Sequence, residues 1–219
     1  DPANLFLARG PVLRLTAEMV RDQALLASGK LVEKVGGESV QESANRRSVY
    51  TYRKRTAPPD NMLIFDAGSR EICQPKRLNT NTPLQALVLL NNPGFVESAK
   101  QLAVRVSKSS AEPATQITEA FRQVCTRAPR PAELAALTEL YATQKANPPQ
   151  FAPAPVAPKA EPKKADPKVV AKQTNPKAKK SPAPPPAPAM PRMPADPAMA
   201  ALTLVCSTIL ASDAAVTSR

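Results

Sequence analysis

The densest group of polar side chains that could perform chemistry lies between residues 66 and 85. It contains two carboxylates five residues apart, Asp66 and Glu71. The neighbouring arginines Arg70 and Arg77 would shift the pKa values of these two carboxyl groups apart. Such a pair can supply a general acid and a general base for glycosidic or ester hydrolysis. The other polar members of the group are Asn79, Asn81, Thr82 and Gln85.

A structural role accounts for the same residues. The two acids would pair with the arginines, while Asn79, Asn81 and Thr82 would close a loop and cap a helix that begins at Pro83. The free N–H groups at the start of that helix also offer a seat for an anion. The candidate ligands of such an anion are Arg70, Arg77, Asn79, Asn81, Thr82 and Gln85. Glycan sites normally present aromatic platforms, but the chain has no Trp, five Phe and three Tyr. We therefore assign no catalytic residue and favour the structural role.

A second group of charged residues is the densest basic cluster in the part of the chain that we expect to fold. With Tyr50 and Tyr52 interleaved, the cations could bind phosphates while the rings stack on bases. The favoured alternative is a solvated helix whose arginines pair with Asp60, Asp66 and Glu71. Nucleic acid is therefore not an expected partner. The members of this basic cluster are Arg46, Arg47, Arg53, Lys54 and Arg55.

The chain contains no histidine and three widely separated cysteines. The lack of histidine excludes Ser-His-Asp and Cys-His nucleophile activation and His-ligated zinc. No Cys-x-x-Cys spacing occurs, which excludes zinc ribbons and the attachment of c-type haem within this chain. We therefore expect neither a metal nor a cofactor here. Buried free thiols are favoured for Cys73, Cys125 and Cys206, with a Cys125–Cys206 disulfide as the alternative.

More than half of the 26 prolines, and half of the net charge of +12, fall within residues 147–197. This stretch has almost no large apolar side chains, so it cannot offset the entropy that a chain loses on folding. We predict an all-α domain of residues 1–146 and 197–219, interrupted by a disordered insertion at 147–196. The apolar run from Pro197 is too short to span a membrane, and we expect it to return to the same core as a helix.

Capping residues and apolar spacing predict the helices that must position these groups. Thr82 and Asn92 each precede a proline, which suits the first position of a helix, so two helices should follow one another directly. The expected elements are helices at 16–28, 83–90, 93–107, 113–127 and 131–145 and from 197, a helical turn at 31–35, a helix rather than a strand at 46–54, and a loop with one helical turn at 62–75.

Two helices carry more specific expectations. In the first, one side carries Met19, Gln23, Leu26 and Ala27, whereas Glu18, Arg21, Asp22 and Leu25 fall elsewhere. Before Pro131, Arg130 stands where Ser, Thr or Asp would cap the helix better. We predict that Arg130→Asp raises the stability by up to ~1 kcal/mol.

Four blocks of the sequence carry a family resemblance. The most specific is Asn81-Thr82-Pro83-Leu84-Gln85-Ala86-Leu87, and the others lie at 7–24, at 46–73 and at 121–134. Together they resemble domain-of-unknown-function family 1553, a C-terminal domain of large planctomycete proteins. The chain departs from the family pattern at Arg53 and Gly68 and lacks a stretch after Val40.

The family has no established activity, so the resemblance implies in which kind of protein the chain occurs and implies no reaction. It implies a piece of a larger extracytoplasmic protein whose partners are its cytochrome-c-like and other planctomycete-specific domains, with polysaccharide as a further partner. Any haem would belong to those upstream domains. No signal peptide is visible in the chain. We expect an accessory or interaction module; the alternatives are a hydrolytic or carbohydrate-active domain using Asp66 and Glu71, and a weak polyanion binder using residues 46–55.

Overall fold

The computed structural model describes residues 1, 3–8, 10, 13–55, 58–68, 73, 75–147 and 193–218. Helices dominate these residues, which confirms the predicted all-α class. The predicted insertion lies almost wholly outside the described residues. The elements are β1 (Leu13–Arg14), α1 (Ala17–Ala27), the 3-10 helix η1 (Ser48–Tyr50), α2 (Asp60–Ile64), α3 (Pro83–Asn91), α4 (Pro93–Ser107), α5 (Pro113–Cys125), α6 (Pro131–Ala146), α7 (Pro197–Ala211), α8 (Asp213–Val216) and β2 (Thr217–Ser218).

Helices α3 to α7 each begin with proline, which loses nothing at the first helical position because its missing N–H would have no partner there. The Asn92 side chain accepts the N–H of Gly94 at 2.9 Å, and Asp196 accepts that of Ala198 at 3.1 Å. These two residues cap α4 and α7 as their positions predict. Thr82 precedes α3 as expected, but its side chain makes no capping hydrogen bond.

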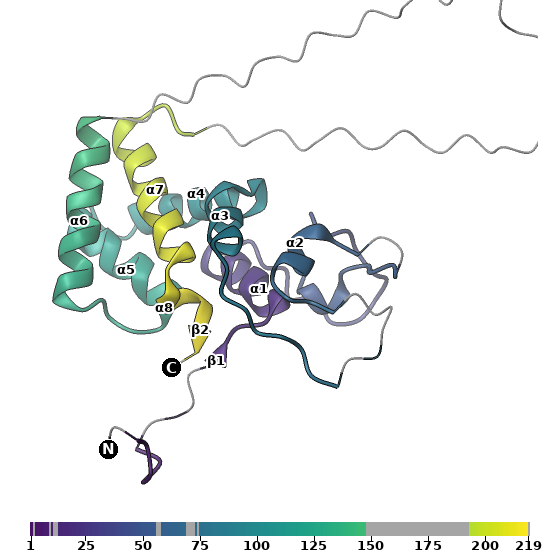
Figure 1. The fold of residues 1–219 in the computed structure, drawn as a ribbon. Helices are drawn as coiled ribbons and strands as arrows, with labels where there is room; N and C mark the ends of the chain where they lie inside the picture. The colour runs from purple at the N-terminus through teal and green to yellow at the C-terminus, as the bar shows by residue number, and fades with distance from the viewer. Residues whose placement is uncertain are drawn as a thin grey trace, which may run out of the picture. The chain divides into compact units, whose positions relative to one another are not determined.

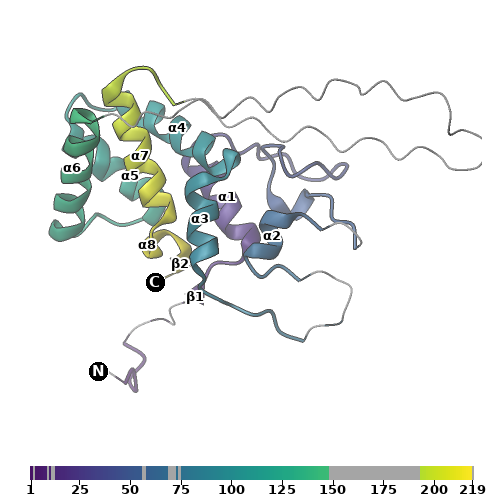
Figure 2. The ribbon, with the colours of Figure 1, turned by 45° about the horizontal axis from the view of Figure 1, so that its top comes forward.

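Helix α7 lies inside the bundle, against α3, α4, α5 and α6 (Figures 1 and 2). Its Ala201, Val205 and Cys206 side chains are fully buried, and those of Leu202 and Ile209 are nearly so. They join a single apolar cluster to which α1, α4 and α5 also contribute. The apolar segment that follows residue 196 therefore completes the core built by residues 17–141.

Strands β1 and β2 form a short antiparallel pair. Leu13 is opposite Ser218 and Arg14 is opposite Thr217. The N–H of Leu15 also donates to the carbonyl of Val216 at 2.8 Å, which extends the contact into α8. The pairing places β1 beside the end of the α7–α8 segment (Figure 1).

Between α1 and α2 the structure differs from the prediction. Residues 31–35 form no helical turn; their regular structure is limited to a parallel bridge between Val32 and Arg46. The predicted helix at 46–54 shrinks to η1, flanked by extended residues, with a second bridge between Val40 and Thr51. Both predictions were wrong because contacts to α1, absent from any local pattern, hold this stretch as a folded loop.

The structure divides the side of α1 to which the sequence assigned Met19, Gln23, Leu26 and Ala27. Val20, Ala24, Leu25 and Ala27 face the core, whereas the Met19 and Leu26 side chains are 55% and 56% exposed. The side that carries these two large apolar residues is turned toward the loop at 31–50 and toward solvent.

Candidate functional site

Asp66 closes a loop in this structure. It follows α2 with a left-handed backbone at φ 61°, a conformation that Asp tolerates better than most residues. Its Oδ2 accepts hydrogen bonds from the backbone N–H and the hydroxyl of Thr80, both at 2.7 Å. The Gln85 amide lies 3.4 Å from the same oxygen. Asp66 thereby ties the end of α2 to the segment that leads into α3.

Gln85 is the centre of a buried polar contact between three elements. Its side chain is 1% exposed. Its Nε2 donates to the carbonyl of Ile64 at 2.9 Å, and its Oε1 accepts from Nη2 of Arg14 at 2.7 Å. Gln85 thus joins β1, α2 and α3, a structural role within the group in which we considered it as a ligand residue.

The other members of that sequence group are spread apart. Asn79, Asn81 and Thr82 are exposed, and Thr80, which the sequence analysis missed, takes the loop-closing role expected of them. Arg70 and Glu71 lie outside the described residues. The proposed acid–base pair therefore has one described member, Asp66, whose Oδ2 is occupied by Thr80 and Gln85.

Glu18 on α1 accepts hydrogen bonds from two arginines. Arg53 Nη1 lies 3.1 Å from its Oε1 and Arg77 Nη1 lies 2.8 Å from its Oε2. Burial works to raise the pKa of Glu18, but the hydrogen bond from its own backbone and the two arginines outweigh it, so this pKa is lowered. The Arg53 side chain is only 7% exposed. The sequence predicts that carboxylates such as Asp60, Asp66 and Glu71 pair with the basic cluster, but in the structure the partner of Arg53 is Glu18.

Arg21 and Asp22, the next polar residues of α1, bind the loop at 42–48. The Arg21 guanidinium donates to the carbonyls of Glu42, Ala44 and Arg46, and to the hydroxyl of Ser48 at 3.0 Å. Asp22 accepts from the N–H of Ser48 at 2.7 Å and from its hydroxyl at 2.6 Å. One turn of helix thereby fixes a loop that lies more than 20 residues away in sequence.

Arg46 organises the other half of the same loop. Its guanidinium lies 4.1 Å from the centre of the Tyr50 ring and donates to the carbonyls of Lys34, Gly36 and Glu38. The Tyr50 hydroxyl accepts the N–H of Gly36 at 3.0 Å. Arg46 is thus engaged within the chain, as a stacked and multiply bonded arginine typically is.

The basic cluster is therefore divided. Arg46 and Arg53 are held by contacts within the chain, whereas Arg47, Lys54 and Arg55 are exposed. The Arg47 side chain is 64% exposed and lies 3.7 Å from Asp22. These three exposed residues are the members of the cluster that a partner could reach.

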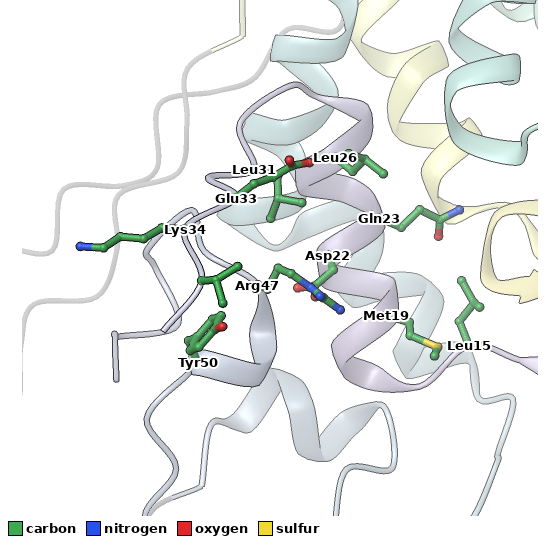
Figure 3. A pocket seen from close by; sticks show the side chains of 11 residues that line it. Leu15, Met19, Asp22, Gln23, Leu26, Leu31, Glu33, Lys34, Arg47 and Tyr50 are labelled. Carbon is green, nitrogen blue, oxygen red and sulfur yellow. The ribbon is translucent and has the colours of Figure 1, made fainter. Parts of the chain in front are cut away.

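Between α1 and the loop at 31–50 lies a pocket of about 630 Å³ (Figure 3). Apolar side chains from both elements supply most of its wall, and charged groups lie among them. Its lining residues are Leu15, Met19, Asp22, Gln23, Leu26, Leu31, Glu33, Lys34, Val35, Arg47 and Tyr50.

The cysteines are free thiols in the structure, and they differ in environment. Cys206 is buried, Cys125 is half-buried and Cys73 is exposed, so the expectation of three buried thiols fails at Cys73. Burial raises the pKa of Cys125 to about 11 and that of Cys206 to about 12, which keeps both protonated near neutral pH. Among the described residues no cluster of three potential metal ligands occurs. No helix in the same ranges is both long and apolar enough to cross a membrane.

These contacts define an α-helical domain in which the polar residues of α1 hold loops in place beside an exposed apolar pocket. The chain matches PSD1, described as a protein of unknown function (DUF1553), over residues 1–141. It belongs to this family, as the sequence blocks indicated. The match ends within α6, so α7 lies beyond it. No curated protein and no solved structure matches the chain.

The residues that sequence reasoning missed lie mostly in one of the family blocks. Glu18, Arg21 and Asp22 are three polar residues within one helical turn and a half, yet only Glu18 lies in the first turn, where a carboxylate favours the helix terminus. The concentration of charged residues on a short helix was the feature of the sequence from which their role could have been inferred. It indicates polar partners outside the helix without naming them.

Proposed function

We propose that this chain is a non-enzymatic interaction module of a larger extracytoplasmic protein of planctomycete type, and that it acts through contacts with the neighbouring domains. In this proposal the neighbours are cytochrome-c-like and other planctomycete-specific domains, and they carry any haem. Polysaccharide is a further candidate partner. Family membership supports this context, because the resemblance on which it was first based is to C-terminal domains of such proteins.

One observation carries the proposal: large apolar side chains are exposed on two helices. Met19 and Leu26 of α1 are over half exposed, and Leu84, Leu87 and Leu90 of α3 are 55%, 59% and 43% exposed. Helix α3 carries no charged residue at all. Exposed apolar groups that recur along a helix are typical of a surface that another protein covers.

The polar groups support the same choice. A catalytic carboxylate must be free to exchange a proton with substrate, but Asp66 uses Oδ2 to hold Thr80 and Gln85. The hydrolytic alternative with Glu71 therefore has weaker support. The polyanion alternative is left with Arg47, Lys54 and Arg55, and it predicts an affinity for heparin or nucleic acid that falls steeply with salt.

The test compares the isolated chain with the same residues inside the parent protein. Hydrogen exchange at the amides of α1 and α3 should slow in the parent, and the melting temperature of this module should rise, because a partner that binds only the folded state stabilises it. Exchange and melting that are identical in both settings would contradict the proposal. Turnover of a glycoside or ester by the isolated chain would favour the hydrolytic alternative.

A further inference from the structure

The pocket beside α1 has an apolar floor that nothing in the described chain covers. Met19 and Leu26 stand on the same side of the helix, seven residues apart, with Gln23 between them. Leu31 and Val35 line the same pocket from the loop, and Val35 is 90% exposed. A seven-residue step along a helix covers about 10 Å, which suits two turns of a partner helix or a few extended residues.

The loop that forms the opposite wall is held by many polar contacts. Arg21 and Asp22 fix residues 42–48 from the helix, and Arg46 fixes residues 34–38 from within the loop. Because these contacts already hold the loop in one conformation, the loop does not have to become ordered when a ligand binds. Preorganisation of this kind strengthens binding because less entropy is lost in the complex.

The charge around the pocket selects the partner. Residues 30–55 contain seven Lys and Arg residues against three Glu. Asp22, the acid in the floor, is already hydrogen-bonded by Ser48 and lies near Arg21 and Arg47. In Figure 3 the Arg47 side chain lies over Asp22, and Lys34 projects from the loop. Arg21, Lys34 and Arg47 thus stand against Asp22 and Glu33 at the pocket, three cations against two acids.

We infer that this pocket is the docking site for an apolar protein segment that carries acidic side chains. This inference rests on the proposed function and adds the place and the chemistry of the contact. The apolar side chains of the segment bury Met19, Leu26 and Val35, and its carboxylates face Lys34 and Arg47. Complementary charge of this kind contributes mainly to partner choice and to the rate of association.

The experiment uses two labelled helical peptides with leucines at positions i, i+3, i+4 and i+7. One carries glutamates on its flanks and the other carries lysines at the same positions. Fluorescence anisotropy with the full 219-residue chain measures both affinities. The glutamate peptide should bind at least about tenfold more tightly, a difference of about 1.4 kcal/mol. Leu26→Ser and Arg47→Glu should each weaken it several-fold.

The matched control is Leu78→Ser, which removes an exposed leucine outside the lining of the pocket and should leave the affinity unchanged. Circular dichroism verifies that each variant folds. The inference is overturned if neither peptide binds, if both bind equally, if Leu26→Ser has no effect, or if only vesicles of anionic lipid bind. Slower exchange at α3 alone in the parent protein would leave the interaction module standing while removing this pocket as its contact.

Discussion

At the scale of single residues, α1 shows how charged side chains act as structural contacts. Glu18 holds Arg53 and Arg77, Arg21 holds the carbonyls of a distant loop, and Asp22 holds Ser48. Apart from Arg77, which is 45% exposed, each partner is largely removed from water by folding, and leaving such a group unsatisfied would cost about 1–3 kcal/mol. Helix α1 therefore carries these charged residues because they hold distant loops in place.

The stability should depend on pH through Glu18. Its pKa is lowered in the folded state, so its contribution is present above the unfolded value of about 4.5 and is lost as the pH falls through the folded value. Glu18→Gln should lower the free energy of unfolding by about 1–3 kcal/mol at pH 7, since Arg53 would lose its carboxylate. Urea unfolding between pH 7 and pH 3 should show this difference shrinking below about pH 4.5.

The control for this experiment is Glu139→Gln on α6, where the glutamate is exposed. Its effect should be within about 0.5 kcal/mol at every pH. A Glu18→Gln curve that stays parallel to the wild-type curve across the whole range would show that Glu18 is not the group that titrates.

At the scale of elements, the start of α6 shows half of a reciprocal cap. Glu133 accepts the backbone N–H of Arg130 at 2.7 Å and is held in two places by the Arg127 guanidinium. The hydrogen bonds from Arg127 and then from Arg130 lower the pKa of Glu133 to about 2. The missing half is an acceptor at position 130 for the free N–H groups of the first turn, because arginine has none to offer.

Arg130→Ser should complete this cap and raise the free energy of unfolding by about 0.5–1 kcal/mol. Arg130→Asp should help less than the sequence alone predicts, because its carboxylate would lie near Glu133. The melting temperatures of both variants and of the wild type show which of the three is the most stable. The interpretation of the cap is wrong if the aspartate variant is the more stable, or if neither differs from the wild type.

At the scale of the whole molecule, α7 is the element on which the bundle depends. It contacts α3, α4, α5, α6 and α8, and Ile209 is 1% exposed within the shared core. Removing three carbons there leaves a cavity that the surrounding helices fill only in part. The energetic consequence should therefore reach the whole domain and should not be confined to the last helix.

Ile209→Ala should lower the free energy of unfolding by about 2–4 kcal/mol. Thr208→Ala, at the neighbouring exposed position, should change it by less than about 0.5 kcal/mol. Urea unfolding followed by circular dichroism measures both. A loss of helix signal in two separate steps, with only the smaller step shifted in Ile209→Ala, would show that α7 unfolds independently of the remaining helices.

The sequence by itself determined the helical class, the family and the starts of α3 to α7. These features depend on interactions within a few residues, such as Pro83 following Thr82 and Asn92 capping Gly94. Only the tertiary structure decided which polar residues matter, because their partners lie far along the chain: Arg21 is 25 residues from Arg46, and Arg14 is 71 residues from Gln85. Local patterns contain no information about such pairs. For that reason the sequence suggested an acid–base site at Asp66, a residue that in the structure closes a loop through Thr80. For the same reason the exposed pocket beside α1 was not predicted.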